Sequence, residues 1–129
     1  MTLPNKTKDI IVKENTYTIT FPTNRQLMSI YSRKAQLSKE GYDSLNTSRD
    51  GNSKYVAMLI DAIATFENIM PQQFFKDLNV TNLGDLDVIQ GAELVKVYQD
   101  QYEPFFNSVV MAIAEVLNPK KENKATEAV

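Results

Sequence analysis

The chain has 129 residues, of which 43% are hydrophobic and 23% are charged, as expected for one globular domain. Its 14 basic and 16 acidic residues give a net charge of −2, which argues against nucleic acid as a partner because phosphate binding requires a clustered basic surface. The sequence has no histidine, cysteine or tryptophan, so the commonest general base, the thiolate nucleophile and the usual zinc ligands are all missing.

The first elements predicted along the chain are two strands that form a β-hairpin over residues 9–21. In the second strand Tyr17, Ile19 and Phe21 alternate with polar residues, which is the period of a half-buried strand. We expect the turn at Glu14–Asn15. Because two strands alone are marginal in water, the hairpin is expected to pack on helices or to pair with the edge of another chain.

A first helix is predicted from Thr23 to about Glu40. Thr23 and Gln26 have the spacing of a capping box, and Gly41 is expected to end the helix. The next segment, Tyr42–Ser53, is rich in Ser, Asn, Asp and Gly and is predicted to be a loop.

The segment Tyr55–Met70 predicts a helix that is apolar around nearly its whole circumference, since most of its polar residues fall in a stripe about 60° wide. A helix that covers one side of a domain has a much narrower apolar face. We therefore expect neighbours on several sides of this helix. Asp61 interrupts the apolar run, which is too short for a membrane span.

Three further helices are expected after this segment. Pro71 begins a short one, and a longer helix covers about Leu86–Tyr102, with Asp85 or Asp87 as its N-cap. Pro104 is expected to break or kink the chain before the last helix, about Glu103–Leu117.

The predicted fold is mainly α, a small bundle of about four to five helices around the central apolar helix, with the N-terminal β-hairpin. Residues 1–117 form a single domain, and residues 118–129, which contain almost no large apolar side chain, form a disordered tail. The helices Thr23–Glu40, Leu86–Tyr102 and Glu103–Leu117 are expected to surround the central one.

Paired phenylalanines provide the candidate binding surface. Neighbouring residues of a helix point about 100° apart, so one ring of each adjacent pair is expected to be exposed or to be buried by a partner. Asp61 is expected to pair with a lysine or to cap a neighbouring helix, and to orient helices near this surface. The candidate partner-binding residues are Phe74, Phe75, Tyr102, Phe105, Phe106 and Asp61.

Three segments, YTITFPTNRQL, DAIATF followed by MP, and VYQDQYEPFFN, carry a resemblance to a known family. In this order, over about Tyr17–Val110, the chain resembles the tail assembly chaperones of long-tailed bacteriophages and prophages. The resemblance implies a mostly helical, non-enzymatic protein of the host bacterial cytoplasm. It also implies that the chain binds the long helical tape-measure protein, recruits tail-tube protein and is absent from the finished tail.

We therefore expect a chaperone without catalytic residues, metal or cofactor, and without nucleic-acid or membrane partners, while self-association into a homo-oligomer stays open. The lack of a secretory signal and of cysteine fits the cytoplasmic location. One alternative is a head–tail connector or minor tail protein that stays in the particle. Another is a small carboxylate-dependent enzyme, with Asp61, Glu67 and Asp77 converging in a cleft, or a DNA-binding protein.

Overall fold

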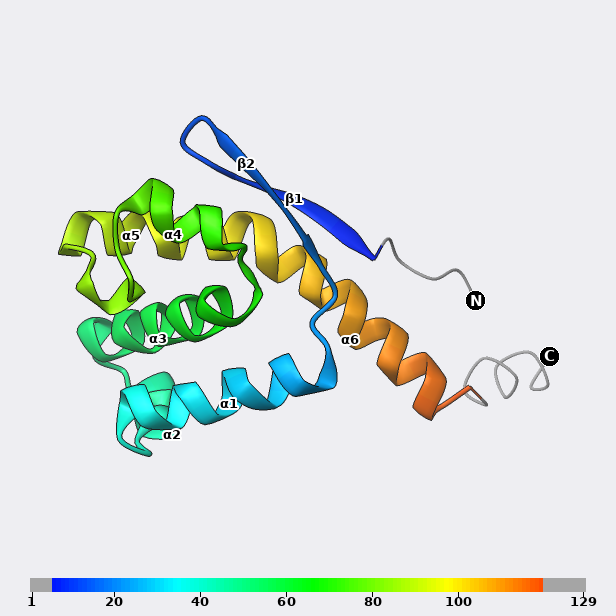
Figure 1. Ribbon diagram of the computed structural model, residues 1–129. Helices are drawn as coiled ribbons and strands as arrows, with labels where there is room; N and C mark the ends of the chain where they lie inside the picture. The colour runs from blue at the N-terminus through cyan, green and yellow to red at the C-terminus, as the bar shows by residue number, and fades with distance from the viewer. Residues whose placement is uncertain (1–5, 120–129) are drawn as a thin grey trace.

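The computed structural model describes residues 6–119, and the fold is mainly α with an N-terminal β-hairpin (Figure 1). Most of the predicted disordered tail, residues 120–129, lies outside the described part. The elements in chain order are β1 (Thr7–Val12), β2 (Asn15–Thr20), α1 (Asn24–Ser38), α2 (Tyr42–Thr47), α3 (Gly51–Ile69), α4 (Gln72–Leu78), the 3₁₀ turn η1 (Leu83–Asp85), α5 (Val88–Val97), the π-helical turn η2 (Tyr98–Tyr102) and α6 (Glu103–Leu117).

The predicted hairpin is confirmed, with antiparallel pairing of β1 and β2. Its turn lies one residue earlier than expected, because Val12 pairs with Asn15 and Lys13 takes the left-handed conformation with a φ of 57°. Ile10, Tyr17 and Ile19 are buried on one face of the hairpin, whereas the threonines of β2 are exposed on the other. The period-two pattern therefore identified the buried face correctly.

Helix α1 begins with the predicted capping box: the Thr23 hydroxyl accepts from the Gln26 N–H, and the Gln26 side chain accepts from the Thr23 N–H. Its end differs from the prediction. Lys39 and Glu40, with φ of 53° and 66°, take the left-handed conformation, and Gly41 instead precedes the first residue of α2.

The predicted loop over Tyr42–Ser53 is wrong, because residues Tyr42–Thr47 form α2 and α3 already begins at Gly51. Helix α2 lies against α1 and α3 (Figure 1). The Tyr42 hydroxyl donates to Asp61 Oδ2 at 2.7 Å, so a long-range contact anchors a segment whose own composition favours a loop.

Helix α3 is the central helix, as predicted, and packs against α1, α2 and α5. Every residue from Ala62 to Phe66 is buried, which covers more than a full turn of the helix. Within its polar stripe, Asp61 faces α1 and α2 through an ion pair with Lys34 and a hydrogen bond from Tyr42, whereas Thr65 is buried and hydrogen-bonds Tyr98 of η2. Burial over this turn accounts for the apolar circumference in the second half of the helix, while Val56 in the first half is 40% exposed.

Helices α5 and α6 are joined without a break through η2. Asp87 caps α5 with Gln90 in a second capping box, so Asp87 is the predicted N-cap. In η2 the Glu103 N–H donates to the Tyr98 carbonyl five residues earlier. Pro104 has no N–H and its ring clashes with the carbonyl four residues back in a regular helix, so the wider turn lets the helix continue through proline.

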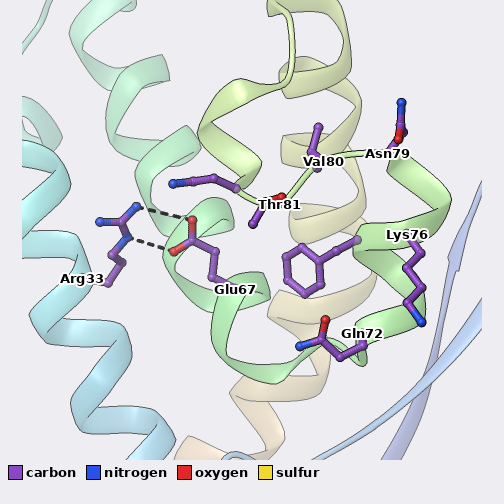
Figure 2. Close-up of a pocket in the computed structure, with 9 residues that line it drawn as sticks. Arg33, Glu67, Gln72, Lys76, Asn79, Val80 and Thr81 are labelled. Atoms are coloured by element: carbon purple, nitrogen blue, oxygen red, sulfur yellow. Dashed lines mark hydrogen bonds and ion pairs between the residues drawn. The ribbon is translucent and has the colours of Figure 1, made fainter.

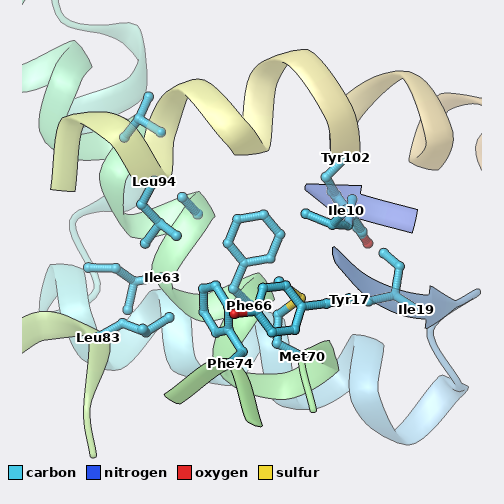
Figure 3. Packing of buried hydrophobic residues seen from close by; sticks show 12 residues of the cluster. Ile10, Tyr17, Ile19, Ile63, Phe66, Met70, Phe74, Leu83, Leu94 and Tyr102 are labelled. Carbon is cyan, nitrogen blue, oxygen red and sulfur yellow. The ribbon is translucent and has the colours of Figure 1, made fainter. Parts of the chain in front are cut away.

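Phe66 lies at the centre of the core that joins these elements (Figure 3). Its ring makes edge contacts with Phe74, Tyr98 and Tyr102 at centroid distances of 5.8–6.1 Å. Tyr17 of the hairpin packs on Phe74 at 5.2 Å. The core therefore links α3, α4, η2 and the hairpin through aromatic rings.

The expectation that the last helix helps to surround α3 is wrong. No residue of α6 is buried, and Figure 1 shows the helix extending beyond the body of the domain. Within residues 6–119, no helix has the length and hydropathy needed to span a bilayer.

Candidate protein-binding surface

The predicted aromatic surface lies mainly inside the domain. Phe74 and Tyr102 are 0% and 2% exposed, so neither presents its ring to a partner in this structure. Phe75, Phe105 and Phe106 are half-buried and pack against the core. In the Phe74–Phe75 pair, the Phe74 ring therefore points inward. The rings of Phe75, Phe105 and Phe106 lie at the edge of the core, partly exposed to solvent.

These rings hold the hairpin and the helices together. Tyr102 stacks on Phe106 with a centroid distance of 5.7 Å and an interplanar angle of 16°. Phe105 contacts Phe21, just after β2, at 5.3 Å. Aromatic pairs of this geometry stabilise a core beyond the area that they bury.

Asp61 pairs with a lysine, as predicted. Its Oδ1 lies 2.9 Å from Lys34 Nζ, and its Oδ2 accepts from the Tyr42 hydroxyl. The Lys34 ammonium also lies over the rings of Tyr31 and Tyr42, at 5.1 and 5.4 Å from their centroids. Burial, together with the hydrogen bond to Asp61, raises the pKa of Tyr42. Asp61 thus orients α1 and α2 on α3, with its carboxylate engaged inside the domain.

A second carboxylate, Asp77 on α4, anchors the hairpin. It accepts hydrogen bonds from the Tyr17 hydroxyl and from Gln73 Nε2. The Tyr17 hydrogen bond, followed by that of Gln73, lowers the pKa of Asp77 below its usual 3.8. Burial, with a further contribution from Asp77, raises the pKa of Tyr17 to about 12.

We expect this anchor to make stability depend on acid pH. Because the folded state lowers the pKa of Asp77, its contribution is present above the unfolded value of 3.8 and is lost as the pH falls through the folded value. Urea unfolding of the wild type and of Asp77→Asn from pH 7 to pH 2 measures this, with the exposed Asp85→Asn as control. The stability difference between wild type and Asp77→Asn is expected to shrink below about pH 4. A difference that stays constant would contradict the assignment.

An open depression of about 650 Å³ lies between α1, the end of α3 and α4 (Figure 2). Arg33 in its wall is held by Glu67, with Nε 2.8 Å from Oε2. The rest of the lining combines the Phe75 ring with polar and apolar side chains, and Lys76 at the rim. The lining contains no cysteine, histidine or serine, and its one carboxylate, Glu67, is held by Arg33.

The three carboxylates that the enzyme alternative would bring together each pair with a different side chain. Asp61 pairs with Lys34, Glu67 with Arg33, and Asp77 with Tyr17. Within the described residues 6–119, no group of three or more acidic side chains is arranged to hold a metal ion. The geometry that the enzyme alternative requires is not found in this part of the chain.

Within residues 6–119, the largest run of exposed apolar side chains lies on α6, the helix that was expected to help surround α3. Five large apolar residues there are each 45–72% exposed: Val110, Met111, Ile113, Val116 and Leu117. We call these five residues the α6 surface. Val110, Ile113, Val116 and Leu117 lie on one side of the helix and Met111 on another. Spacing alone does not tell whether the same chain or another one covers such residues.

Smaller exposed apolar groups lie elsewhere. Val88 and Ile89 begin α5 at 79% and 69% exposure, and Met28 and Tyr31 lie on the outer side of α1. Exposed apolar residues in ones and twos are normal on protein surfaces. A helix that is apolar around most of its circumference is normally buried, so the α6 surface is the stronger candidate for a binding site.

Comparison of the chain with known proteins gave no match to a family model, to a curated protein or to a solved structure.

Proposed function

We propose that this protein is a non-enzymatic assembly factor that binds an apolar helix of another protein through the α6 surface. The observation that carries the proposal is the exposure of five large apolar side chains on a helix that extends from the domain. Burying exposed apolar surface of this kind against a partner lowers the free energy by about 25 cal/mol per Å². The rest of the domain supplies a folded, polar support for this helix.

The spacing of the residues on α6 indicates what kind of partner segment would fit against them. Val110, Ile113 and Leu117 lie at i, i+3 and i+7, which is the a–d–a spacing of a helix that packs its side chains between those of another. Val116 lies beside this seam. The partner expected is therefore an amphipathic helix with an apolar heptad seam.

Within this class we propose a phage tail assembly chaperone of the bacterial cytoplasm, which holds the helices of a tape-measure protein and brings tail-tube protein to them. This identity draws on the resemblance carried by YTITFPTNRQL, DAIATF…MP and VYQDQYEPFFN. The α6 surface supports it because a tape-measure protein offers long helices of the required kind.

Co-expression with a phage tape-measure protein, a long helical protein of the proposed partner class, tests the proposal. We expect the wild type to keep that protein soluble and to co-purify with it, and we expect Ile113→Asp and Leu117→Asp to lose both effects because a carboxylate would enter an apolar seam. The readouts are the soluble fraction of the long protein and its recovery with the tagged chain.

Val88→Asp and Ile89→Asp are matched controls, since they place the same charge at exposed apolar positions on α5, 79% and 69% exposed against 45% for Ile113 and 72% for Leu117. Both are expected to bind as the wild type does. Equal loss in the α5 and α6 variants would contradict a site on α6, and failure of the wild type to bind would contradict the chaperone function.

Mass spectrometry of purified phage particles separates the chaperone from a connector or minor tail protein. A chaperone is expected in the lysate and absent from the particles. A stoichiometric amount of this chain in the particles would overturn the chaperone identity and favour the structural role.

A further inference from the structure

The two edges of the hairpin differ in how they are protected. On the β1 edge, the Ile11 N–H donates to Gln101 Oε1 and the Ile11 carbonyl accepts from Gln101 Nε2, both at 2.7 Å. The side-chain amide of Gln101, in η2, therefore makes the hydrogen bonds that a neighbouring strand would make. Because this amide hydrogen-bonds both the N–H and the carbonyl of Ile11, another strand cannot pair with this edge residue.

The β2 edge has no such cover. Because Val12 and Asn15 pair across a two-residue turn, the main-chain groups of alternate residues in β2 point away from β1. These residues are Thr16, Thr18 and Thr20. Within the described residues 6–119, no main-chain group of these three has a hydrogen-bond partner outside the hairpin. All three side chains are exposed.

Strand β2 also lacks the features by which natural proteins block an edge. Its sequence, NTYTIT, contains no charged residue, proline or glycine, and threonine, tyrosine and isoleucine all favour strands. On the outer face of the hairpin, Asp9 of β1 lies beside this edge and accepts from the Thr18 hydroxyl at 2.7 Å. The edge is therefore suited to pair with another strand.

The order of residues in β2 indicates which strand fits. Thr16, Tyr17, Thr18, Ile19 and Thr20 have the same alternation of threonine and large apolar residue in both directions from Thr18. A second β2 placed antiparallel about Thr18 would set threonine opposite threonine on the outer face and Tyr17 opposite Ile19 on the inner face. Such cross-strand pairs are favourable, and a two-fold axis makes the interface self-complementary.

We propose that two copies of this chain pair through their β2 edges, antiparallel about a two-fold axis at Thr18, and form a four-stranded sheet. Thr18 of each copy exchanges two main-chain hydrogen bonds with Thr18 of the other, and Thr16 does so with Thr20 of the other. The interface is separate from the α6 surface, so the proposal stands without the function proposed above.

Single cysteine variants test this register, because the chain has no cysteine of its own. Directly paired residues that exchange hydrogen bonds have Cα atoms about 5.5 Å apart, within the range that a disulfide bridges. Thr18→Cys is therefore expected to form a disulfide-linked dimer under mild oxidation. The measurement is non-reducing electrophoresis of the full chain, with reversal by a reductant.

Thr16→Cys and Thr20→Cys are the matched controls. Each lies four residues from its own copy across the axis, about 14 Å away, so neither cross-links alone. An equimolar mixture of the two is expected to cross-link. Absence of the Thr18→Cys dimer, or equal cross-linking by all three single variants, would overturn the proposed register.

A proline at the axis supplies a second test. The Thr18 N–H points away from β1, so Thr18→Pro removes a donor of the interface without removing a main-chain hydrogen bond of the hairpin. The hydroxyl bond to Asp9 is lost in Thr18→Pro and in the control Thr18→Val alike. By analytical ultracentrifugation, Thr18→Pro is expected to weaken self-association at least about tenfold, because two hydrogen bonds are lost per dimer. Thr18→Val, which keeps the N–H, is expected to associate like the wild type. A wild type that stays monomeric at high concentration would reject the pairing.

Discussion

Replacing Phe66 with alanine is expected to lower the free energy of unfolding by about 3–5 kcal/mol, the range observed for phenylalanine in a packed core. The side chain is fully buried, and its ring contacts three other aromatic rings, those of Phe74, Tyr98 and Tyr102. Because α4 and η2 pack on α3 through this ring, the cavity would lie where the elements meet. Urea unfolding followed by circular dichroism measures the loss.

Two further variants calibrate that result. Phe66→Leu keeps most of the apolar volume and is expected to lose less stability than the alanine variant. Met28→Ala removes an exposed side chain and is expected to change the free energy of unfolding by no more than about 0.5 kcal/mol. A Phe66→Ala effect as small as that of Met28→Ala would contradict the central position of the ring.

The second large effect is expected at Asp61. In Asp61→Ala the Lys34 ammonium and the Tyr42 hydroxyl both lose their carboxylate partner, and the side chains of Asp61 and Lys34 are each only 18% exposed. Leaving such groups without a partner costs about 1–3 kcal/mol. We expect a loss near 2 kcal/mol, with faster amide exchange in α2 because this helix depends on the Tyr42 contact.

The exposed pair Lys96–Asp100 on the α5–η2 segment is the control, with its side chains 79% and 58% exposed. Asp100→Ala is expected to change stability by less than about 1 kcal/mol, since water already solvates both charges. A double-mutant cycle with Lys34→Ala isolates the pair. Equal losses at Asp61 and Asp100 would mean that burial adds nothing to the inner pair.

Local signals predicted the fold well where the determining contacts are close in sequence. The alternation in β2, the capping box at Thr23, an N-cap at Asp85 or Asp87, and the apolar circumference of α3 are all properties of a few neighbouring residues. The structure confirms them, with Asp87 as the N-cap. The prediction was wrong for α2. That helix is stabilised by a hydrogen bond from Tyr42 to Asp61, 19 residues later, and no local pattern reports such a contact.

The candidate site was harder to predict for a related reason. Helical spacing shows that a face is apolar, but the same spacing in Phe106, Val110 and Ile113 fits a helix packed inside the domain and a helix exposed for a partner. The paired phenylalanines were the wrong place to look for an open surface, because Phe74 fits into the core and its neighbour closes the border. Three-dimensional packing alone distinguishes these cases.

The π-helical turn η2 also sets the direction in which α6 points its side chains. One additional residue per turn rotates everything that follows by about 100° about the helix axis. Deleting a single residue between Tyr98 and Tyr102 would therefore re-aim all five residues of the α6 surface together, without changing their identity or spacing. The direction in which the α6 side chains point therefore depends on the number of residues in η2 and not on the residues of α6 itself. An insertion or deletion of one residue at this turn is enough to change it.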